Sequence, residues 1–244
     1  MYVMADVATV KHFQMTFAGK KVIKDLSFSV KKGEVFGLLG SNGCGKTTTI
    51  RALLGLYQPS GGELLINGKK FDPGGDFVVG YLPEERGLYK KESVIDVMTY
   101  FGRLKGVEDP REWSLKYLKR VDLLDVATMA TGKLSQGMQQ KVQIGITIMG
   151  NPKLLILDEP TKGFDPVNRK LLMSIITELH DKGTAIIMIT HYMDEVERLC
   201  DRALLLKDGV ARAYGTIKDI RKEFDGRSLD DIFVKVYGEK ANAQ

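Results

Sequence analysis

Cysteines and long hydrophobic runs are scarce in this sequence of 244 residues. Its two cysteines, Cys44 and Cys200, cannot form the framework of a disulfide-rich secreted domain, so we expect a reducing, cytoplasmic environment. The longest purely apolar stretches, such as 154–157 and 185–189, are far shorter than the roughly 20 residues that a membrane-spanning helix needs. No basic segment precedes an apolar run at the N-terminus, so no secretory signal is expected.

The composition excludes disorder and fibrous repeats as the main state. Hydrophobic residues make up 43% and charged residues 27% of the chain, as in ordinary globular proteins, and neither an internal repeat nor a low-complexity segment is evident. The net charge of +5 (36 basic minus 31 acidic residues) suits an anionic ligand, a membrane surface or nucleic acid without choosing among them. The length allows one large domain or two small ones.

Apolar patterning predicts strands that alternate with helices, and therefore a largely parallel sheet. Short strands are expected within 1–32, and a strand buried on both faces over 35–39. A helix over 46–57 follows, and helical spacing of apolar residues predicts a mostly helical insert over 92–128. Further along, the pattern predicts strands over 154–157 and 184–190, helices over 167–180 and 192–200, and a hairpin at Asp208-Gly209.

The strongest motif is Gly40-Ser41-Asn42-Gly43-Cys44-Gly45-Lys46-Thr47, which fits GxxxxGK[ST] between a predicted strand and a predicted helix. Its glycines let the backbone curl so that several N–H groups share one concavity, to which the helix N-terminus adds positive potential. Lys46 would place a charge at the β and γ phosphates of a nucleotide, and the Thr47 hydroxyl would ligate Mg²⁺. The alternative is a Gly-rich turn with a solvated Lys46.

An acidic pair follows the predicted strand 154–157, at the edge where ligands bind in open α/β sheets. Asp158 would hold Mg²⁺ through water, and Glu159 would polarise an attacking water as a general base. In isolation such a pair is often only the opening of a turn. Together with a phosphate loop it becomes a more specific signal.

Taken in their order along the chain, the motifs resemble those of the ATP-binding cassette (ABC) ATPases. The resemblance covers about residues 10–234. The segment Leu134-Ser135-Gln136-Gly137-Met138 resembles the ABC signature, 161–165 the D-loop, and His191 the switch histidine. The resemblance implies that the signature reaches the γ-phosphate bound by a second copy and that Asp165 crosses the dimer interface. It also implies that His191 contacts the γ-phosphate and that Phe17 stacks on adenine, a core position being the alternative for Phe17. The implied nucleotide-binding residues are Phe17, Gly40, Ser41, Asn42, Gly43, Cys44, Gly45, Lys46, Thr47, Thr48, Ser135, Gln136, Gly137 and Asp165; the catalytic ones are Glu159, His191 and Lys46; and the metal ligands are Thr47, Glu84 and Asp158.

Three features depart from the family pattern. Glu84, in the segment 81–86, stands where glutamine is usual, and its carboxylate can still approach Mg²⁺. Gln136 and Met138 replace Gly and Gln in the signature, a form that occurs in the branch called ABC-2-type exporters. Cys44 lies inside the phosphate loop near a helix N-terminus, which predicts a lowered thiol pKa, a reactive thiol, and loss of nucleotide binding on alkylation.

The resemblance implies an α/β fold: a RecA-like P-loop NTPase core with an N-terminal antiparallel β region and a helical subdomain. A single ABC ATPase domain is expected over 1–244, with the core over 1–85 and 149–215, the helical subdomain over 86–148 and a C-terminal tail over 216–244. Two copies, or this chain and a paralogue, would sandwich two ATP molecules in a head-to-tail dimer.

The role implied is an ATP-hydrolysing subunit, cytoplasmic and peripheral on the inner face of the cell membrane, beside a separate polytopic transmembrane subunit. Leu88, Tyr89 and Lys90-Lys91 are expected to contact that subunit, a solvated loop being the alternative. The tail 228–233 resembles that of exporters of drugs, lipids or polysaccharides. The remaining hypotheses are a soluble single-cassette ATPase in an assembly or nucleic-acid process, and a regulatory module without turnover. The chain lacks a basic–aromatic stripe, so no nucleic acid is expected as partner.

Overall fold

The computed structural model describes residues 6–84 and 87–238. The start of the chain at 1–5 lies outside the described residues, and so do Glu85 and Arg86 of the segment 81–86. The chain divides into two compact units: Met1–Phe77 with Leu179–Gln244 form the first unit, and Val78–Glu178 form the second unit. Each is described below by itself.

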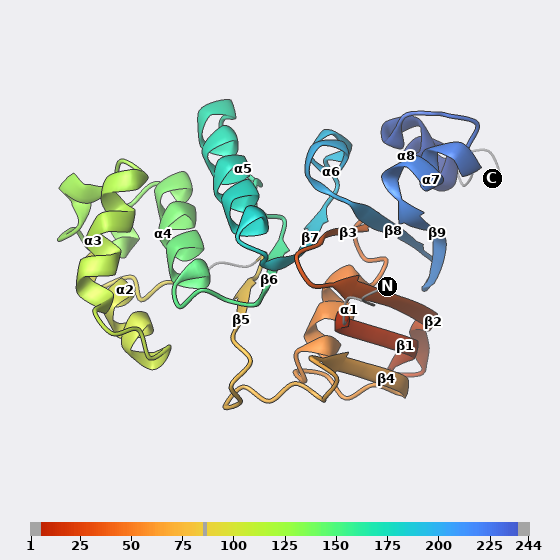
Figure 1. Cartoon of the computed structure of the whole chain (residues 1–244), viewed down its shortest axis with the longest axis horizontal. Coiled ribbons are helices and arrows are strands. Elements are labelled where there is room, and N and C mark those ends of the chain that lie inside the picture. The colour runs from red at the N-terminus through yellow and green to blue at the C-terminus, as the bar shows by residue number, and fades with distance from the viewer. Residues whose placement is uncertain (1–5, 85–86, 239–244) are drawn as a thin grey trace. The chain divides into compact units, whose positions relative to one another are not determined.

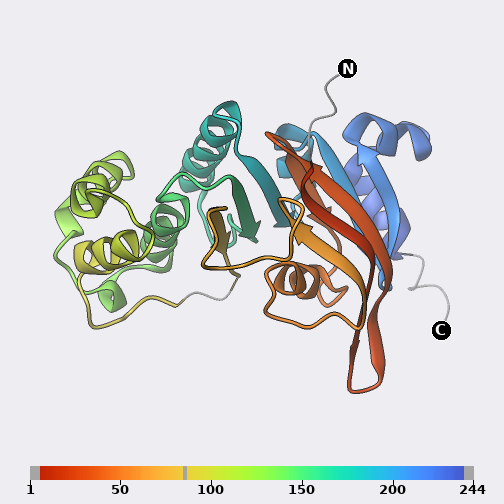
Figure 2. The same ribbon diagram turned by 60° about the horizontal axis from the view of Figure 1, so that its bottom comes forward.

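The first unit begins with an antiparallel region. β1 (Asp6–Phe17) and β2 (Lys20–Lys31) form a long hairpin, clearly seen in Figure 2, and β4 (Gly61–Ile66) pairs antiparallel with the other side of β1. Alternating burial along β2, where Leu26, Phe28 and Val30 are buried, is what the apolar alternation in this segment predicts.

The rest of this sheet is built around a fully buried strand, β3 (Val35–Leu39). β3 lies between β7 (Ala185–Thr190) and β8 (Arg202–Lys207), which run parallel to it, and β9 (Val210–Thr216) returns antiparallel to β8. The strand order in this unit is β4-β1-β2-β9-β8-β3-β7. Every residue of β3 and β7 is buried, which agrees with their uninterrupted apolar sequences.

Four helices of the first unit connect or cover these strands: α1 (Lys46–Leu53), α6 (Met193–Leu199), α7 (Ile217–Glu223) and α8 (Leu229–Gly238). Figure 1 shows α7 and α8 together near the end of the chain; α7 packs on β9 and α8 on α6. The prediction that the first helix extends to residue 57 is wrong. Gly55, with φ +69°, ends it in a Schellman motif, in which Leu56 N donates to Arg51 O at 2.8 Å.

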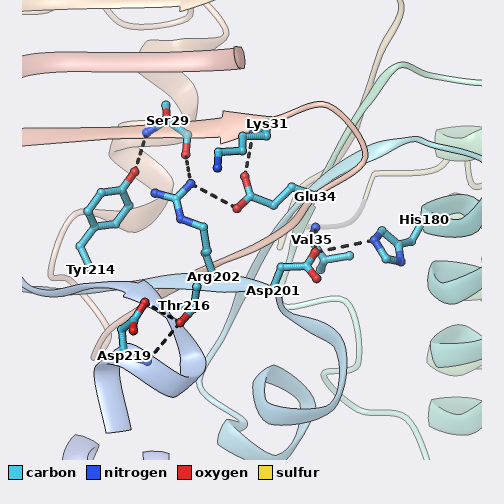
Figure 3. Close-up of polar contacts among 10 residues, drawn as sticks. All are labelled: Ser29, Lys31, Glu34, Val35, His180, Asp201, Arg202, Tyr214, Thr216 and Asp219. Carbon is cyan, nitrogen blue, oxygen red and sulfur yellow. Dashed lines mark hydrogen bonds and ion pairs between the residues drawn. The ribbon is translucent and has the colours of Figure 1, made fainter. Parts of the chain in front are cut away.

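A polar cluster joins the beginnings of β3 and β8 (Figure 3). The buried Glu34 carboxylate accepts a hydrogen bond from Arg202 at 3.2 Å, and Arg202 also donates to Ser29 O at 3.4 Å. Asp201 accepts from Val35 N at 2.8 Å. These contacts fix the register of β2, β3 and β8 at the edge opposite the one where β3 enters the Gly-rich loop.

The second unit pairs two short parallel strands, β5 (Val79–Leu82) and β6 (Leu154–Asp158), and adds the helical insert that the sequence predicts. Tyr117 fixes the packing of this insert, since its hydroxyl donates to Lys141 O at 2.7 Å and a Cβ at Gly145 would lie 2.4 Å from its ring. Within the described ranges, no helix is long and apolar enough to cross a membrane. The helices are α2 (Val94–Leu104), α3 (Pro110–Arg120), α4 (Gln136–Ile148) and α5 (Pro166–Asp181, of which 179–181 are counted with the first unit), with 3-10 turns at Leu124–Val126 and Thr131–Lys133.

Candidate nucleotide-binding site

The predicted phosphate loop connects β3 directly to α1, whose first residue is Lys46. Gly43 and Gly45 have φ of +76° and +111°, values that side-chain-bearing residues rarely adopt. At Gly45 a Cβ would lie 2.4 Å from Ile23 Cδ1, so no larger residue fits there without movement. The loop therefore curls tightly at the N-terminus of α1, an arrangement that is suited to binding phosphate groups.

The Lys46 side chain is buried and lies across the loop. Its Nζ donates to Gly40 O at 2.7 Å and to Ser41 O at 3.0 Å. The solvated lysine of the alternative interpretation is not observed. Thr47 and Thr48 occupy the first turn of α1 and are half-buried. The loop thus holds a positive charge and two hydroxyls at the helix N-terminus.

His191 follows β7 at the same sheet edge as the phosphate loop. β3 and β7 are paired in register up to Leu39 and Thr190, so Gly40 and His191 come next on neighbouring strands. Thr190 Oγ1 accepts from Tyr192 N at 3.1 Å, which holds the turn after β7. His191 is exposed at this edge, with its ring 4.3 Å from that of Tyr192.

Phe17 ends β1 and is 42% exposed, so the alternative of a core position is wrong for this residue. Its ring meets Tyr57 edge-on, with 5.4 Å between the centroids. An exposed aromatic ring at a strand end is available for stacking on a planar ligand.

Beside the loop, residues 41–44 line an open pocket of about 850 Å³ in the first unit. Basic side chains dominate the rest of its lining, and Asp208 is the acidic residue among the lining residues. A surface of this charge favours an anionic ligand. The basic residues are Lys20, Lys21, Lys24, Lys207 and Arg212.

The prediction of a lowered pKa for Cys44 is wrong. Burial raises the pKa of the thiol and outweighs the opposing effects of the Lys46 charge and of neighbouring hydrogen-bond donors. The sulfur packs so closely against the loop that a Cβ at Gly40 would lie 2.5 Å from it. Proximity to a helix N-terminus is not enough to make this thiol reactive at neutral pH.

In the second unit, Asp158 ends β6 and Glu159 follows it, and both are buried. Glu159 has φ +50°, a left-handed conformation that costs a non-glycine residue on the order of 1 kcal/mol or more. Such strain at a buried carboxylate indicates a functional constraint on its placement. The strand thus delivers two buried acids to its carboxyl end, as the sequence predicts.

The signature segment begins helix α4 in the second unit. Ser135 is its N-cap, and the hydroxyl accepts from Met138 N at 3.2 Å. Gly137, in the first turn, has open space beside it, because a Cβ there would meet no atom closer than Phe164 Cδ1 at 4.0 Å. Nothing within its own chain therefore requires glycine at this position.

Two acidic residues of the predicted site have partners within the second unit. Glu84 forms an ion pair with Lys162 of the D-loop segment, with 2.6 Å between Oε1 and Nζ. Asp165 accepts from Asn168 N at 2.8 Å and Val167 N at 2.9 Å and so caps α5. The hydrogen bond from the Asn168 backbone is the main cause of the lowered pKa of Asp165.

Comparison with known proteins identifies the family. The family model described as ABC transporter matches residues 23–162. The chain belongs to the ABC transporter family. The predicted ABC resemblance, its exporter-like pattern and the α/β P-loop NTPase fold are thereby confirmed.

Several of the similar proteins are named as ATP-binding components. An uncharacterised ABC transporter ATP-binding protein of Methanocaldococcus jannaschii is 45% identical over 86% of this chain and 78% of its own length. Nod factor export ATP-binding protein I of Rhizobium sp. (strain N33) is 35% identical over 95% of this chain and 77% of its own. A solved ATP-binding subunit of an ABC transporter aligns with a TM-score of 0.83 and 31% identity, covering 94% of this chain and 98% of that one.

The side chains present fit ATP with Mg²⁺. The described part of the chain contains no group of three or more His, Cys, Asp or Glu side chains that could hold a metal alone. Mg²⁺ suits such a chain, because it is usually bound by one or two protein oxygens, waters and the phosphates of a nucleotide. The Thr47 hydroxyl of the first unit and the Asp158 carboxylate of the second unit each offer an oxygen of the kind that would ligate this ion.

Two residues that support the ABC motifs are missed by sequence reasoning. Gln140 is buried and donates to Pro160 O, the residue that follows Glu159. Lys105 donates to Ile146 O at 2.6 Å and Thr147 O at 3.2 Å, which caps the C-terminal end of α4, and burial lowers its pKa to about 8. Neither belongs to a short motif, because their partners lie 20 to 42 residues away.

Proposed function

We propose that this chain binds and hydrolyses ATP as the energy-coupling subunit of an ABC transporter whose membrane subunit is a separate polytopic chain. The observation that carries the proposal is the phosphate loop of the first unit, where buried Lys46 spans the loop and His191 emerges at the same sheet edge. Family membership supports the remaining assignments.

In this proposal, the loop 40–48 binds the phosphates of ATP and Phe17 stacks on its adenine. Lys46 neutralises phosphate charge, and His191 contacts the γ-phosphate. Thr47, Asp158 and Glu84 are the proposed ligands of Mg²⁺. When bound, this ion offsets the charge that develops on the phosphates.

Glu159 is the proposed general base. Its carboxylate takes a proton from a water molecule as the water oxygen attacks the γ-phosphorus, and ADP leaves with the electrons of the broken bond. The buried, strained position of Glu159 supports this role, because strain of this kind concentrates where function constrains a residue. His191 helps to position the water.

We further propose that two copies, or this chain and a paralogue, bind two ATP molecules head to tail. The signature helix of one copy would face the nucleotide of the other, with Ser135, Gln136 and Gly137 at the contact. The open space beside Gly137 supports this arrangement, because a close approach by a second molecule would explain the glycine. Asp165 would lie at the same interface.

An exposed aromatic cluster in the second unit supports a membrane partner. Tyr89 is 55%, Tyr100 48% and Leu104 65% exposed, and Phe101 stacks near Tyr89 with 6.1 Å between ring centroids. Apolar side chains gathered on a surface mark an interaction site. We assign this cluster to a cytoplasmic helix of the membrane subunit, which places the chain on the inner face of the membrane. A relative named as a Nod factor export ATP-binding protein favours export. The proposed class of cargo is a drug, lipid or polysaccharide.

A pull-down tests this assignment. Tagged Glu159→Gln protein is mixed with MgATP and detergent-solubilised native membranes, and co-purifying proteins are identified by mass spectrometry. We expect a polytopic membrane protein at near one-to-one stoichiometry, and its loss when Tyr100→Ser and Leu104→Ser are added. Recovery of soluble partners alone, together with ATPase activity of the wild-type protein, would contradict the transporter role and favour a soluble ABC ATPase.

A further inference from the structure

The last turn of α8 reaches the phosphate loop within the first unit. The Tyr237 hydroxyl donates to Leu206 O near the end of β8, and Tyr237 lines the same pocket as Ser41 and Cys44 of the loop. A Cβ at Gly40 would lie 3.0 Å from this hydroxyl and 2.7 Å from Leu206 O. Four segments therefore meet at the first residues of the loop: β3, the loop itself, β8 and α8.

Helix α8 is firmly held where it carries Tyr237. Lys207, next to Leu206, donates its ammonium to Val236 O, which satisfies a carbonyl of the last turn and complements the negative end of the helix. Val236 and Ile232 are buried, and the Tyr237 ring lies 4.5 Å from that of Phe233. The hydroxyl is thus presented from a fixed support.

The protonation state of Tyr237 suits a permanent hydrogen-bond donor. Burial is the main reason that its pKa rises to about 12, so the hydroxyl keeps its proton throughout the physiological range. A neutral hydroxyl can donate to a carbonyl or a thiolate and accept from a loop N–H.

We propose that Tyr237 is a positioning residue for the nucleotide, and that α8 braces residues 40–44 of the phosphate loop in their binding conformation. The brace connects the loop to β8 through Leu206 and to α8 through the Tyr237 hydroxyl. A braced loop loses less conformational freedom when phosphate binds, so the brace lowers the Kd for ATP. Tyr237 touches no reacting atom, and its removal should leave kcat at saturating ATP nearly unchanged. The proposal rests on the proposed ATP binding.

The test uses the full chain with Tyr237→Phe, which removes the hydroxyl and keeps the ring. Tyr214→Phe is the matched control, because it deletes a hydroxyl that accepts from Ser29 N at 3.1 Å beside the polar cluster of Figure 3. For each variant, calorimetry gives the Kd for ATP, steady-state kinetics give KM and kcat, and peptide mass spectrometry gives the rate of Cys44 alkylation as a function of pH.

For Tyr237→Phe we expect Kd and KM to rise about fivefold, the effect of one neutral hydrogen bond, with kcat within about twofold of wild type. The pH midpoint of Cys44 alkylation should move upward, since the hydroxyl that lowers the thiol pKa is gone. Tyr214→Phe should match wild type in the Kd for ATP, in KM and kcat, and in the pH profile of Cys44 alkylation. A Kd for ATP equal to that of wild type in Tyr237→Phe would contradict the proposed brace. If wild type itself failed to bind ATP, the proposed function would fail, and an unchanged alkylation profile would then overturn the brace separately.

Discussion

Leu39 and Thr190 are register partners on adjacent parallel strands, and both strands end at that pair. The chain continues from Leu39 into the phosphate loop and from Thr190 into His191. Two segments that are far apart in the sequence are thus brought to one edge of the sheet by strand register alone. This edge carries the proposed ATP site of the first unit, and parallel α/β sheets bind ligands at the carboxyl ends of their strands.

Substitution of Gly137 should affect the stability of the fold and the ATPase activity in opposite directions. Gly137→Ala should raise the free energy of unfolding by about 0.5–1 kcal/mol, because alanine is favoured over glycine in a helix and no neighbour is crowded. It should also lower ATPase activity at least about tenfold, because the methyl group would occupy the surface proposed to face the second copy's nucleotide.

Urea denaturation and steady-state hydrolysis measure the two effects of this substitution. Gly74→Ala is the control, since a Cβ there would meet only Asp72 Oδ1 at the ordinary contact distance of 3.6 Å, and it should leave hydrolysis unchanged. Wild-type activity for Gly137→Ala would contradict the head-to-tail arrangement.

The left-handed backbone at Glu159 predicts that a glycine variant is more stable than an alanine variant at this position. Glu159→Gly should be about 1 kcal/mol more stable than Glu159→Ala, because only the glycine adopts φ +50° without strain. Midpoints of urea denaturation compare the two variants. An alanine variant as stable as the glycine variant would contradict the strained conformation.

Cys44 should behave as a thiol whose pKa is raised by partial burial. Its raised pKa predicts slow alkylation at pH 7 and a midpoint above that of an ordinary cysteine, because the thiolate is the reactive form. Bound ATP should slow the reaction further by covering the loop. Mass spectrometry of peptides alkylated by iodoacetamide between pH 7 and 10 provides the profile, and a midpoint below that of free cysteine would show that the helix N-terminus dominates after all.

Lys105 predicts a pH dependence of stability. Its folded pKa of about 8 lies below the ordinary value of 10.5, so between these pH values the unfolded chain holds a proton that the folded chain lacks. The free energy of unfolding therefore rises with pH in this window, by up to about 3 kcal/mol from Lys105. Below pH 8 the contribution of Lys105 no longer changes with pH. Urea denaturation of wild type and Lys105→Met from pH 7 to 10.5 should show that the free energy of unfolding of the wild type increases relative to that of the variant. A difference between the two proteins that stays constant with pH would contradict the lowered pKa of Lys105.

Elements with a strong local signal are predictable from this sequence. β3 is uninterruptedly apolar and β7 is apolar up to Thr190, the phosphate loop is a contiguous motif, and Ser135 caps α4 by accepting from Met138 N, three residues on. In each case neighbouring residues determine the outcome, so the pattern contains the necessary information. The end of α1 depends on one backbone angle, at Gly55, which the helical pattern does not reveal.

Long-range effects account for what the sequence does not predict. The pKa of Cys44 is raised by burial and lowered in part by the Tyr237 hydroxyl of α8, and no local rule includes that residue. Lys105 and Gln140 act on carbonyls of segments distant in the sequence. The Glu84–Lys162 ion pair likewise requires the fold, because each residue taken alone looks solvated.

The most direct test of the account is ATP turnover by Glu159→Gln at saturating MgATP. We predict a fall of at least about 100-fold relative to wild type, with ATP retained on a protein that elutes as a dimer, because the amide cannot accept the proton of the attacking water. Glu112→Gln, which removes an exposed acid of α3 that pairs with Lys116, should turn over at the wild-type rate. Turnover by Glu159→Gln at the wild-type rate would show that Glu159 is not the general base and would contradict the proposed mechanism.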